Sequence, residues 1–294
     1  MKLRLVAPAK LTLNLAVTGV RDDGYHELCS EMVSLDLADE LFLDTTGVGL
    51  SVDPASSVPV SCISEGPDNL INRALVTARR SASVRLIKRI PVGGGLGGGS
   101  SDAGAILRWA GVFDPLVAVS LGSDVPFCVR GGHALVTGVG DQLSPLPYEQ
   151  RSFVLLLPPF GADTASVFNQ WDQMVSRSDV SECSVEPNAG AGSTPTGNDL
   201  EEAALTVEPR LRSWKERFAS ATGATPNLAG SGSTWFVEGD MAGLGLAGTK
   251  FLEMDGSRAR LIDVRTTPSG WDGLLSKSRP QPPSVREGSR PTAK

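Results

Sequence analysis

The stretch PVGGGLGGGSSDA, residues 91–103, decides the fold. Six glycines fall within Gly93–Gly99, between a predicted strand over residues 84–90 and a predicted helix over residues 100–110. Backbone N–H groups approach a ligand closely only where no Cβ intervenes. The N-terminus of a helix adds unpaired N–H donors and the positive end of the helix dipole. The stretch therefore predicts an anion site suited to a polyphosphate.

Two structural alternatives to a phosphate-binding loop are a flexible glycine linker and a tight turn in which Ser100 only caps the helix. A linker rarely leads straight into a capped apolar helix, which favours the phosphate loop. The spacing of the glycines matches neither the GxxxxGK[ST] pattern of P-loop proteins nor the GxGxxG pattern of dinucleotide-binding folds. Those two classes of nucleotide-binding protein therefore fit poorly.

Outward from the loop, short apolar runs and helical spacings follow one another along the chain. We expect strands over residues 2–6, 11–17, 31–37, 40–44, 134–139, 153–157 and 234–237, and helices over residues 69–80, 199–205 and 211–221. The pattern predicts an α+β protein with an N-terminal domain over residues 1–150 and a C-terminal domain over residues 151–275. We expect residues 176–197 to form a flexible loop and residues 276–294 a disordered tail, because both are rich in small, polar or proline residues.

The composition excludes several classes of function. The net charge of −6 argues against nucleic acid as a partner, because nucleic-acid binding needs a basic face. The apolar run Phe153–Phe160 is far shorter than the roughly 20 residues that cross a membrane. Four widely spaced cysteines are expected as free thiols, and two histidines make a multi-histidine metal site improbable. We expect a cytoplasmic protein that binds small molecules and neither nucleic acid nor membrane.

Three further features are candidates for chemistry. Lys10 stands among apolar residues and either points to solvent at a strand end or enters a site. Asp124, in LGSDVPF (residues 121–127), either caps a helix or carries chemistry. The cluster Gly230–Ser233 is either a bare turn or a second wall against phosphates. From the residues alone these alternatives stay open.

These features, in this order, resemble the GHMP superfamily of small-metabolite kinases, which includes galactokinase, homoserine kinase and mevalonate kinase. Residues 91–103 are similar to its phosphate loop, and NLAGSG (residues 227–232) is similar to its C-terminal glycine motif. The resemblance implies ATP and Mg²⁺ as cofactors. It also implies an α+β fold of two domains, with an N-terminal domain like domain 2 of ribosomal protein S5 and a ferredoxin-like C-terminal domain.

Longer strings resemble one family within that superfamily, the 4-diphosphocytidyl-2-C-methyl-D-erythritol kinases. They are APAKL (7–11), DGYHEL (23–28), DNL (68–70), GSDVPF (122–127) and GNDLE (197–201). This resemblance covers residues 5–240 and implies an ATP-dependent kinase that phosphorylates the 2-hydroxyl of that cytidyl alcohol in non-mevalonate isoprenoid biosynthesis. It also implies a monomer or weak homodimer. The alternatives are a homoserine or mevalonate type of kinase and a non-catalytic nucleotide-binding relative.

The resemblance implies a role for each residue of this chain that matches a position of the family's motifs. Asp124 corresponds to the catalytic base and Lys10 to the lysine paired with it. Substrate contacts are implied for Gly230 and Ser231, for the pyrimidine-sandwiching Tyr25 and Phe168, for the cytosine-reading His26, and for Asn14 and Thr164. A hydroxyl contact to Mg²⁺ is implied for Ser101. ATP contacts are implied for Asn69, near the adenine, and for Pro91, Val92, Gly93, Gly94, Gly95, Leu96, Gly97, Gly98, Gly99, Ser100 and Ser101.

One departure from the family pattern lies next to the lysine. The family commonly has Asn two residues after it, where this chain has Thr12, and Asn14 lies two further on. All three side chains would face the same side of a regular strand. We expect either Asn14 to take over the contact with the site or Thr12 to do so through its hydroxyl. The chemistry agrees with the two main roles, because phosphoryl transfer to an alcohol needs a group that takes the hydroxyl proton and a cation that balances charge.

Overall fold

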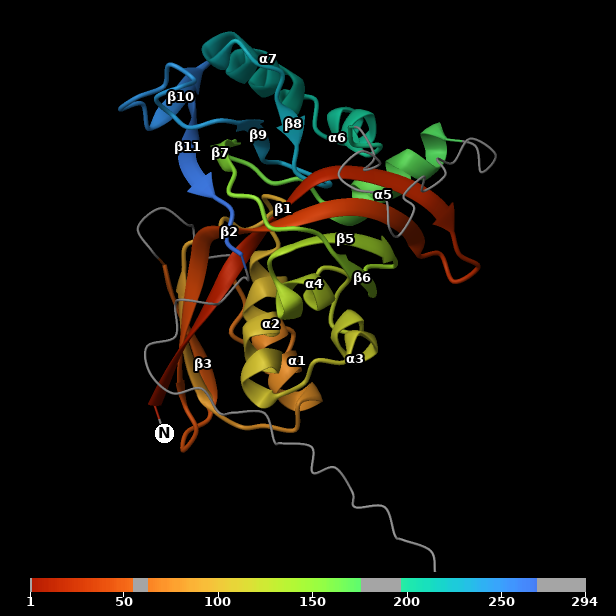
Figure 1. Ribbon diagram of the computed structural model, residues 1–294, viewed down its shortest axis with the longest axis vertical. Coiled ribbons are helices and arrows are strands. Elements are labelled where there is room, and N and C mark those ends of the chain that lie inside the picture. The colour runs from red at the N-terminus through yellow and green to blue at the C-terminus, as the bar shows by residue number, and fades with distance from the viewer. Residues whose placement is uncertain (1, 55–62, 176–196, 269–294) are drawn as a thin grey trace, which may run out of the picture.

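The computed structural model describes residues 2–54, 63–175 and 197–268 (Figure 1). Within these residues the chain forms two units, each built on one sheet with helices beside it, and the expected α+β class is confirmed. The expected tail, and all of the expected flexible loop except Gly197, lie outside the described residues. In the described part of the chain, no helix combines the length and the apolar character needed to cross a membrane.

The N-terminal unit contains a six-stranded sheet in the order β3-β4-β2-β5-β6, with β1 paired to β2. All pairings are antiparallel except that of β3 with β4, whose parallel crossover contains α1. The strands are β1 (Lys2–Val20), β2 (His26–Asp44), β3 (Gly49–Pro54), β4 (Ser83–Lys88), β5 (His133–Gly138) and β6 (Gln142–Pro145). The helices are α1 (Leu70–Thr77), α2 (Gly98–Ala110), α3 (Pro115–Val119) and α4 (Val125–Arg130).

Helix α2 is central to this unit and packs against α1, α4 and strand β1. Its face of small and apolar residues joins a core that includes Leu41, Ile71 and Leu107. The helix begins at Gly98, two residues before the expected start, and its N-cap Gly97 has a left-handed φ of 66°. A residue with a Cβ rarely adopts that conformation. The last glycines of the loop are therefore the first turn of the helix.

The C-terminal unit contains an antiparallel sheet in the order β10-β11-β7-β9-β8. If β10 is left out and the other four strands are numbered along the chain, their order across the sheet is 4-1-3-2. This is the ferredoxin-like order that was expected. The strands are β7 (Ser152–Leu157), β8 (Asn227–Leu228), β9 (Trp235–Glu238), β10 (Phe251–Met254) and β11 (Ser257–Arg265). The helices are α5 (Thr164–Met174), α6 (Glu201–Val207) and α7 (Arg210–Thr222).

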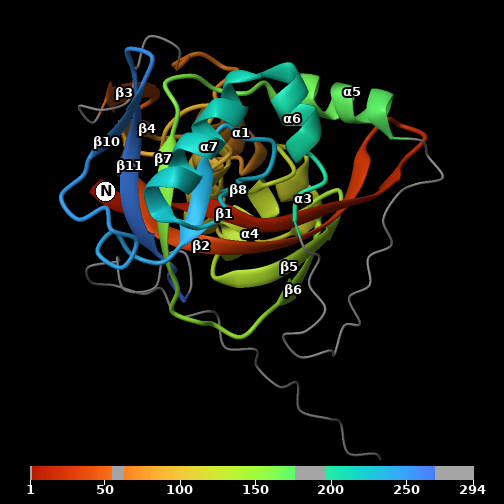
Figure 2. The same ribbon diagram turned by 90° about the horizontal axis from the view of Figure 1, so that it is seen from above.

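The hairpin of β1 and β2 belongs to both units. Its strands are long and run across the molecule beneath α5 and α6 (Figures 1 and 2). Along β1, Ala7 lies in the core of the N-terminal unit, Leu11 in a cluster between the sheets, and Leu15 in the core of the C-terminal unit. The two separate strands expected over residues 2–17 are thus one continuous strand. Its pairing with β2 shifts between Pro8 and Lys10, between Thr12 and Asn14, and between Val17 and Gly19.

The expectation that all four cysteines are free thiols is wrong. Cys29, on β2, is fully buried and disulfide-bonded. Cys128, on α4, is free and buried, and burial, together with the charge of Asp124, raises the pKa of its thiol to about 12. At neutral pH Cys128 therefore remains a thiol and behaves as a core residue.

Candidate active site

A cavity of about 590 Å³ lies between the two units. Its walls come from β1, the glycine loop, the start of α1, the segment before α4, the start of α5 and the glycine cluster after β8. Most of the residues predicted for the site line this cavity: Lys10, Asn69, residues 91–100, Asp124, Thr164, Phe168, Gly230 and Ser231. The structure therefore brings together side chains that are up to 221 residues apart in the sequence.

At three of its glycines, Gly95, Gly97 and Gly98, the loop is packed too closely for a Cβ. A Cβ on Gly97 would lie 2.8 Å from Cγ of Lys10. A Cβ on Gly95, whose φ is +75°, would lie 2.3 Å from the carbonyl oxygen of Ala229 in the second glycine cluster. The backbone of Lys10 also donates a hydrogen bond to the carbonyl of Leu96 at 3.1 Å. The loop is thus in contact with both β1 and the C-terminal unit, and it is not a flexible linker.

Lys10 and Asp124 form an ion pair at the wall of the cavity. Nζ of Lys10 lies 3.3 Å from Oδ2 of Asp124, and it donates a hydrogen bond to Oγ1 of Thr12 at 3.0 Å. The lysine side chain is 6% exposed and the aspartate side chain 29%. Asp124 occupies the N-cap position of α4, but its side chain makes no capping hydrogen bond. The carboxylate is therefore available to a ligand, as a purely structural helix cap would not be.

A second lysine, Lys88, lies buried beneath the glycine loop. Its ammonium contacts Oδ2 of Asp39 at 2.6 Å and Oδ2 of Asp102 at 2.7 Å. Oδ1 of Asp39 accepts hydrogen bonds from two backbone N–H groups, whereas Oδ1 of Asp102 has no protein partner. Burial, opposed by the charge of Lys88 and supported by that of Asp39, raises the pKa of Asp102 to about 8. This cluster ties the first turn of α2 to β2 and β4.

Asn69 lines the cavity at the start of α1, where the family resemblance predicts the adenine. Its Oδ1 caps α1 by accepting a hydrogen bond from the N–H of Ile71 at 2.9 Å, and its Nδ2 donates to the carbonyl of Ser64 at 2.7 Å. Both polar atoms are engaged within the chain. Asn69 therefore shapes this end of the cavity, together with the apolar side chains of Leu70 and Leu86.

Two hydroxyl groups meet across the C-terminal wall of the cavity. Oγ1 of Thr164, the first residue of α5, lies 2.9 Å from Oγ of Ser231. The neighbouring Gly230 approaches β1 so closely that a Cβ there would lie 3.6 Å from Nζ of Lys10. Hydroxyls and exposed backbone at this wall suit an anionic or hydroxyl-rich ligand.

The expected sandwich of Tyr25 and Phe168 is not formed. Tyr25, at the tip of the β1–β2 hairpin, is 64% exposed and does not line the cavity. The ring of His26 lies against Phe168 instead, with ring centroids 4.7 Å apart, and also contacts the edge of Trp171. Nε2 of His26 contacts Oδ1 of Asp172 at 2.7 Å. His26 thus lies beside the cavity without lining it.

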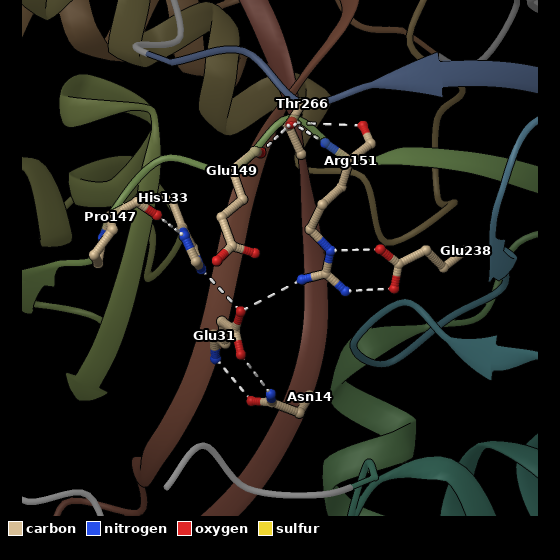
Figure 3. A network of polar contacts seen from close by, with 8 residues as sticks. All are labelled: Asn14, Glu31, His133, Pro147, Glu149, Arg151, Glu238 and Thr266. Atoms are coloured by element: carbon tan, nitrogen blue, oxygen red, sulfur yellow. Dashed lines mark hydrogen bonds and ion pairs between the residues drawn. The ribbon is translucent and has the colours of Figure 1, made fainter. Parts of the chain in front are cut away.

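Asn14 lies outside the cavity and takes part in a different network (Figure 3). Its Nδ2 donates to Oε2 of Glu31 at 3.0 Å, and its Oδ1 accepts from the backbone N–H of the same residue at 2.9 Å. Glu31 also contacts His133 at 2.8 Å and Arg151, at the start of β7, at 3.7 Å. Asn14 therefore helps to join the two units, and the structure gives it no direct route to a ligand.

Ser101 also lies outside the cavity. Its hydroxyl donates to the carbonyl of Pro8 at 2.6 Å and contacts Sγ of Cys128 at 3.3 Å, and the residue is 1% exposed. This arrangement does not fit the expected contact with Mg²⁺. The neighbouring Ser100 does line the cavity.

Sequence reasoning missed Lys88 and left Thr12 unresolved. The one signal for Lys88 was a lysine at the end of an apolar strand, three residues before the glycine loop. The described residues contain no group of three or more His, Cys, Asp or Glu side chains that could hold a metal ion.

Comparison with known proteins places this site in a family. Residues 69–132 match the family described as GHMP kinases N terminal domain. The chain is 37% identical over 269 residues to the 4-diphosphocytidyl-2-C-methyl-D-erythritol kinase of Corynebacterium efficiens, covering 80% of this chain and 84% of the relative. It is 35% identical over 260 residues to the enzyme of the same name from Pelotomaculum thermopropionicum, covering 80% and 88%.

Solved structures agree. A crystal structure of 4-(cytidine 5'-diphospho)-2C-methyl-D-erythritol kinase is similar to this chain with a TM-score of 0.64 and 31% identity, covering 91% of this chain and 100% of that one. The L. major mevalonate kinase in complex with R-mevalonate is similar with a TM-score of 0.57 and 13% identity, covering 90% and 96%. At that identity the second likeness concerns the fold alone.

Proposed function

Because this chain belongs to the 4-diphosphocytidyl-2-C-methyl-D-erythritol kinase family of GHMP kinases, it is an ATP-dependent kinase of that alcohol, and we propose that Lys10 and Asp124 carry out the transfer. The observation that supports these roles is the ion pair of 3.3 Å between the two side chains, in the cavity wall beside the glycine loop. The reaction belongs to non-mevalonate isoprenoid biosynthesis.

The proposed step moves one proton and one phosphoryl group. The oxygen of the 2-hydroxyl attacks the γ-phosphorus of ATP, the bond from that phosphorus to the β,γ-bridging oxygen breaks, and ADP leaves. Asp124 accepts the hydroxyl proton. Lys10 is paired with that carboxylate and lies where it can balance charge on the phosphoryl oxygens. Backbone N–H groups of the glycine loop and the N-terminus of α2 would hold the phosphates of ATP.

We extend this proposal to Mg²⁺, which fits the site as a partner of the nucleotide. Ser100 lines the cavity and would supply a hydroxyl oxygen, while the phosphates of ATP would supply most of the other ligands. When bound there, the ion would neutralise phosphate charge. Ser101 is not included, because its hydroxyl is buried against Pro8.

The substrate would occupy the part of the cavity between β1 and α5. Gly230, Ser231 and Thr164 would contact its diphosphate and alcohol groups. Phe168 would stack on the pyrimidine, with His26 beside it reading the edge of the base. Tyr25 would complete the sandwich only after moving from its exposed position. Asn14 has no part in this arrangement.

A coupled assay of ADP release tests the function. The chain should release ADP with 4-diphosphocytidyl-2-C-methyl-D-erythritol and ATP, and should release little with homoserine or mevalonate. Phosphorus NMR of the product should show a new phosphomonoester. ADP release with homoserine or mevalonate and none with the cytidyl alcohol would contradict the proposal, and so would nucleotide binding without turnover of any of the three.

Three coarser features of the molecule belong to the same proposal. We place the boundary of the two domains near residue 150, between β6 and β7, because the two sheets separate there. We also propose a cytoplasmic protein that is a monomer or weak homodimer, as expected from the sequence. Sedimentation equilibrium at several protein concentrations tests the oligomeric state.

A further inference from the structure

Thr12 makes contacts that suggest a role in the active site. Thr12 lies on β1, is 1% exposed and lines the cavity. Its Oγ1 accepts a hydrogen bond of 3.0 Å from Nζ of Lys10. The same oxygen lies 3.6 Å from where a Cβ on Gly230 would be. Thr12 therefore stands at the corner where β1, the ammonium and the C-terminal glycine cluster meet.

An ammonium on a flexible stem of four carbons needs such contacts to be held in place. Lys10 has three N–H donors and no acceptor. One donor is taken by Thr12 and one is directed toward Asp124 at 3.3 Å. Because a threonine is branched at Cβ, its hydroxyl is confined to few rotamers, and its buried setting confines it further. The position of Oγ1 thus restricts where the ammonium can lie.

We propose that Thr12 is a positioning residue for the transfer: its hydroxyl fixes the ammonium of Lys10 between Asp124 and the phosphoryl group, and leaves the third ammonium hydrogen for a ligand oxygen. The inference rests on the proposed roles of Lys10 and Asp124. It also answers the question left open by the sequence, because Asn14 is engaged by Glu31 and cannot share this task.

The test replaces the hydroxyl without changing the shape of the side chain. T12V removes the acceptor and keeps the branched volume, whereas T12S keeps the acceptor. We expect T12V to lower kcat about 10- to 100-fold, the range of a lost hydrogen bond to a charged group, while the KM for ATP changes by less than about threefold. T12S should keep kcat within about threefold of the wild-type value.

Controls separate this role from simple loss of packing. Thr222, at the end of α7, also donates one side-chain hydrogen bond, to the carbonyl of Phe218, and T222V should leave turnover unchanged. Thermal unfolding reports whether each variant folds. If T12V does not fold, T12A and T12S form a second pair that differ only by the hydroxyl, and T12A should show the same loss of kcat relative to T12S.

The outcomes distinguish this inference from the proposed function. If the wild-type chain turns over the cytidyl alcohol, and T12V retains full kcat or T12S is as slow as T12V, the role of Thr12 is wrong and the proposed function stands. If the wild-type chain has no activity with that substrate, the proposed function itself fails, and the role of Thr12 fails with it.

Discussion

The cavity has two ends that are built differently. At the transfer end, formed by Lys10, Asp124 and the glycine loop, Lys10 is 5% exposed, and Gly95 and Gly97 lie too close to neighbouring groups to carry a Cβ. At the hairpin end Phe168 lines the cavity and packs against His26, which lies beside the cavity, whereas Tyr25 lies outside it and is 64% exposed. Charge developing in a transition state is best stabilised by groups that need no rearrangement. Groups that recognise a base can instead reach their final positions as the ligand binds.

The largest effect is expected for D124N, at the transfer end. Asparagine keeps the shape of the side chain but cannot accept the hydroxyl proton, so kcat should fall about 10²- to 10⁴-fold with little change in the affinity for either substrate. Steady-state assays and calorimetric titration measure the two quantities. D114N is a matched control, because Asp114 caps α3 away from the cavity. Unchanged turnover in D124N would remove Asp124 from the mechanism.

The second test places a methyl group in the packed glycine loop. In G95A the new Cβ would lie 2.3 Å from a backbone oxygen of the second glycine cluster, so one loop must move. We expect the affinity for ATP to fall about 10- to 100-fold, from a strain of roughly 1–3 kcal/mol. G111A is the control: Gly111 has a similar left-handed φ of +78° and open space around it. Equal affinities in the two variants would mean that the collision is unimportant.

The third test removes the ring at the hairpin end. F168A should raise the KM for the cytidyl substrate about tenfold, as expected when one base loses a stacking partner, and should leave kcat within about threefold. F251A, which removes a half-exposed ring from β10, is the matched control and should change neither value. A loss confined to kcat would show that Phe168 acts at the transfer end and would break the contrast.

The smallest effect concerns the ion pair of His133 and Glu31, which lie on neighbouring strands of the N-terminal sheet. Burial lowers the pKa of His133, but its hydrogen bonds to Glu31 and to the carbonyl of Pro147 outweigh burial and raise it above 6.5. Burial raises the pKa of Glu31, but the hydrogen bond and charge of His133 outweigh it and lower it below 4.5. The stabilisation from His133 is therefore complete below its unfolded pKa and is lost as pH rises through the raised value.

Glu31 behaves in the opposite way. Its contribution is present above its unfolded pKa and is lost as pH falls through the lowered value, so the pair contributes most between about pH 4.5 and 6.5. In H133Q the melting temperature should be lower by about 2–4 °C at pH 6 and should approach the wild-type value at pH 9. A constant difference over this range would show that His133 acts through packing and not through its charge.

Sequence reasoning predicted the transfer end better than the hairpin end, and the reasons are local. The glycine loop, Lys10 and Asp124 lie within short, unusual strings whose chemistry allows few alternatives. Asn14 lies outside the cavity because β1 is not a regular strand. The pairing of β1 shifts between Thr12 and Asn14, so the alternation of faces that should have put Asn14 beside Lys10 is interrupted.

Other misses come from tertiary contacts that no string of residues reveals. The hydroxyl of Ser101 donates to the carbonyl of Pro8, which lies 93 residues away in the sequence. Lys88 finds its two carboxylates on β2 and α2, 49 and 14 residues away. The side-by-side rings of His26 and Phe168 depend on how α5 packs over the hairpin tip. Contacts of this kind can be recognised only once the fold is known.

The continuity of β1 through both cores has a mechanical consequence. A strand that is packed into the cores of two units connects them directly. Any change in the relative orientation of the units must then be accommodated where this strand bends most easily. Irregularities in pairing are such points, because a strand bends there. Two of them flank Lys10, one on each side. Rotation of one unit against the other would therefore move the ammonium of Lys10.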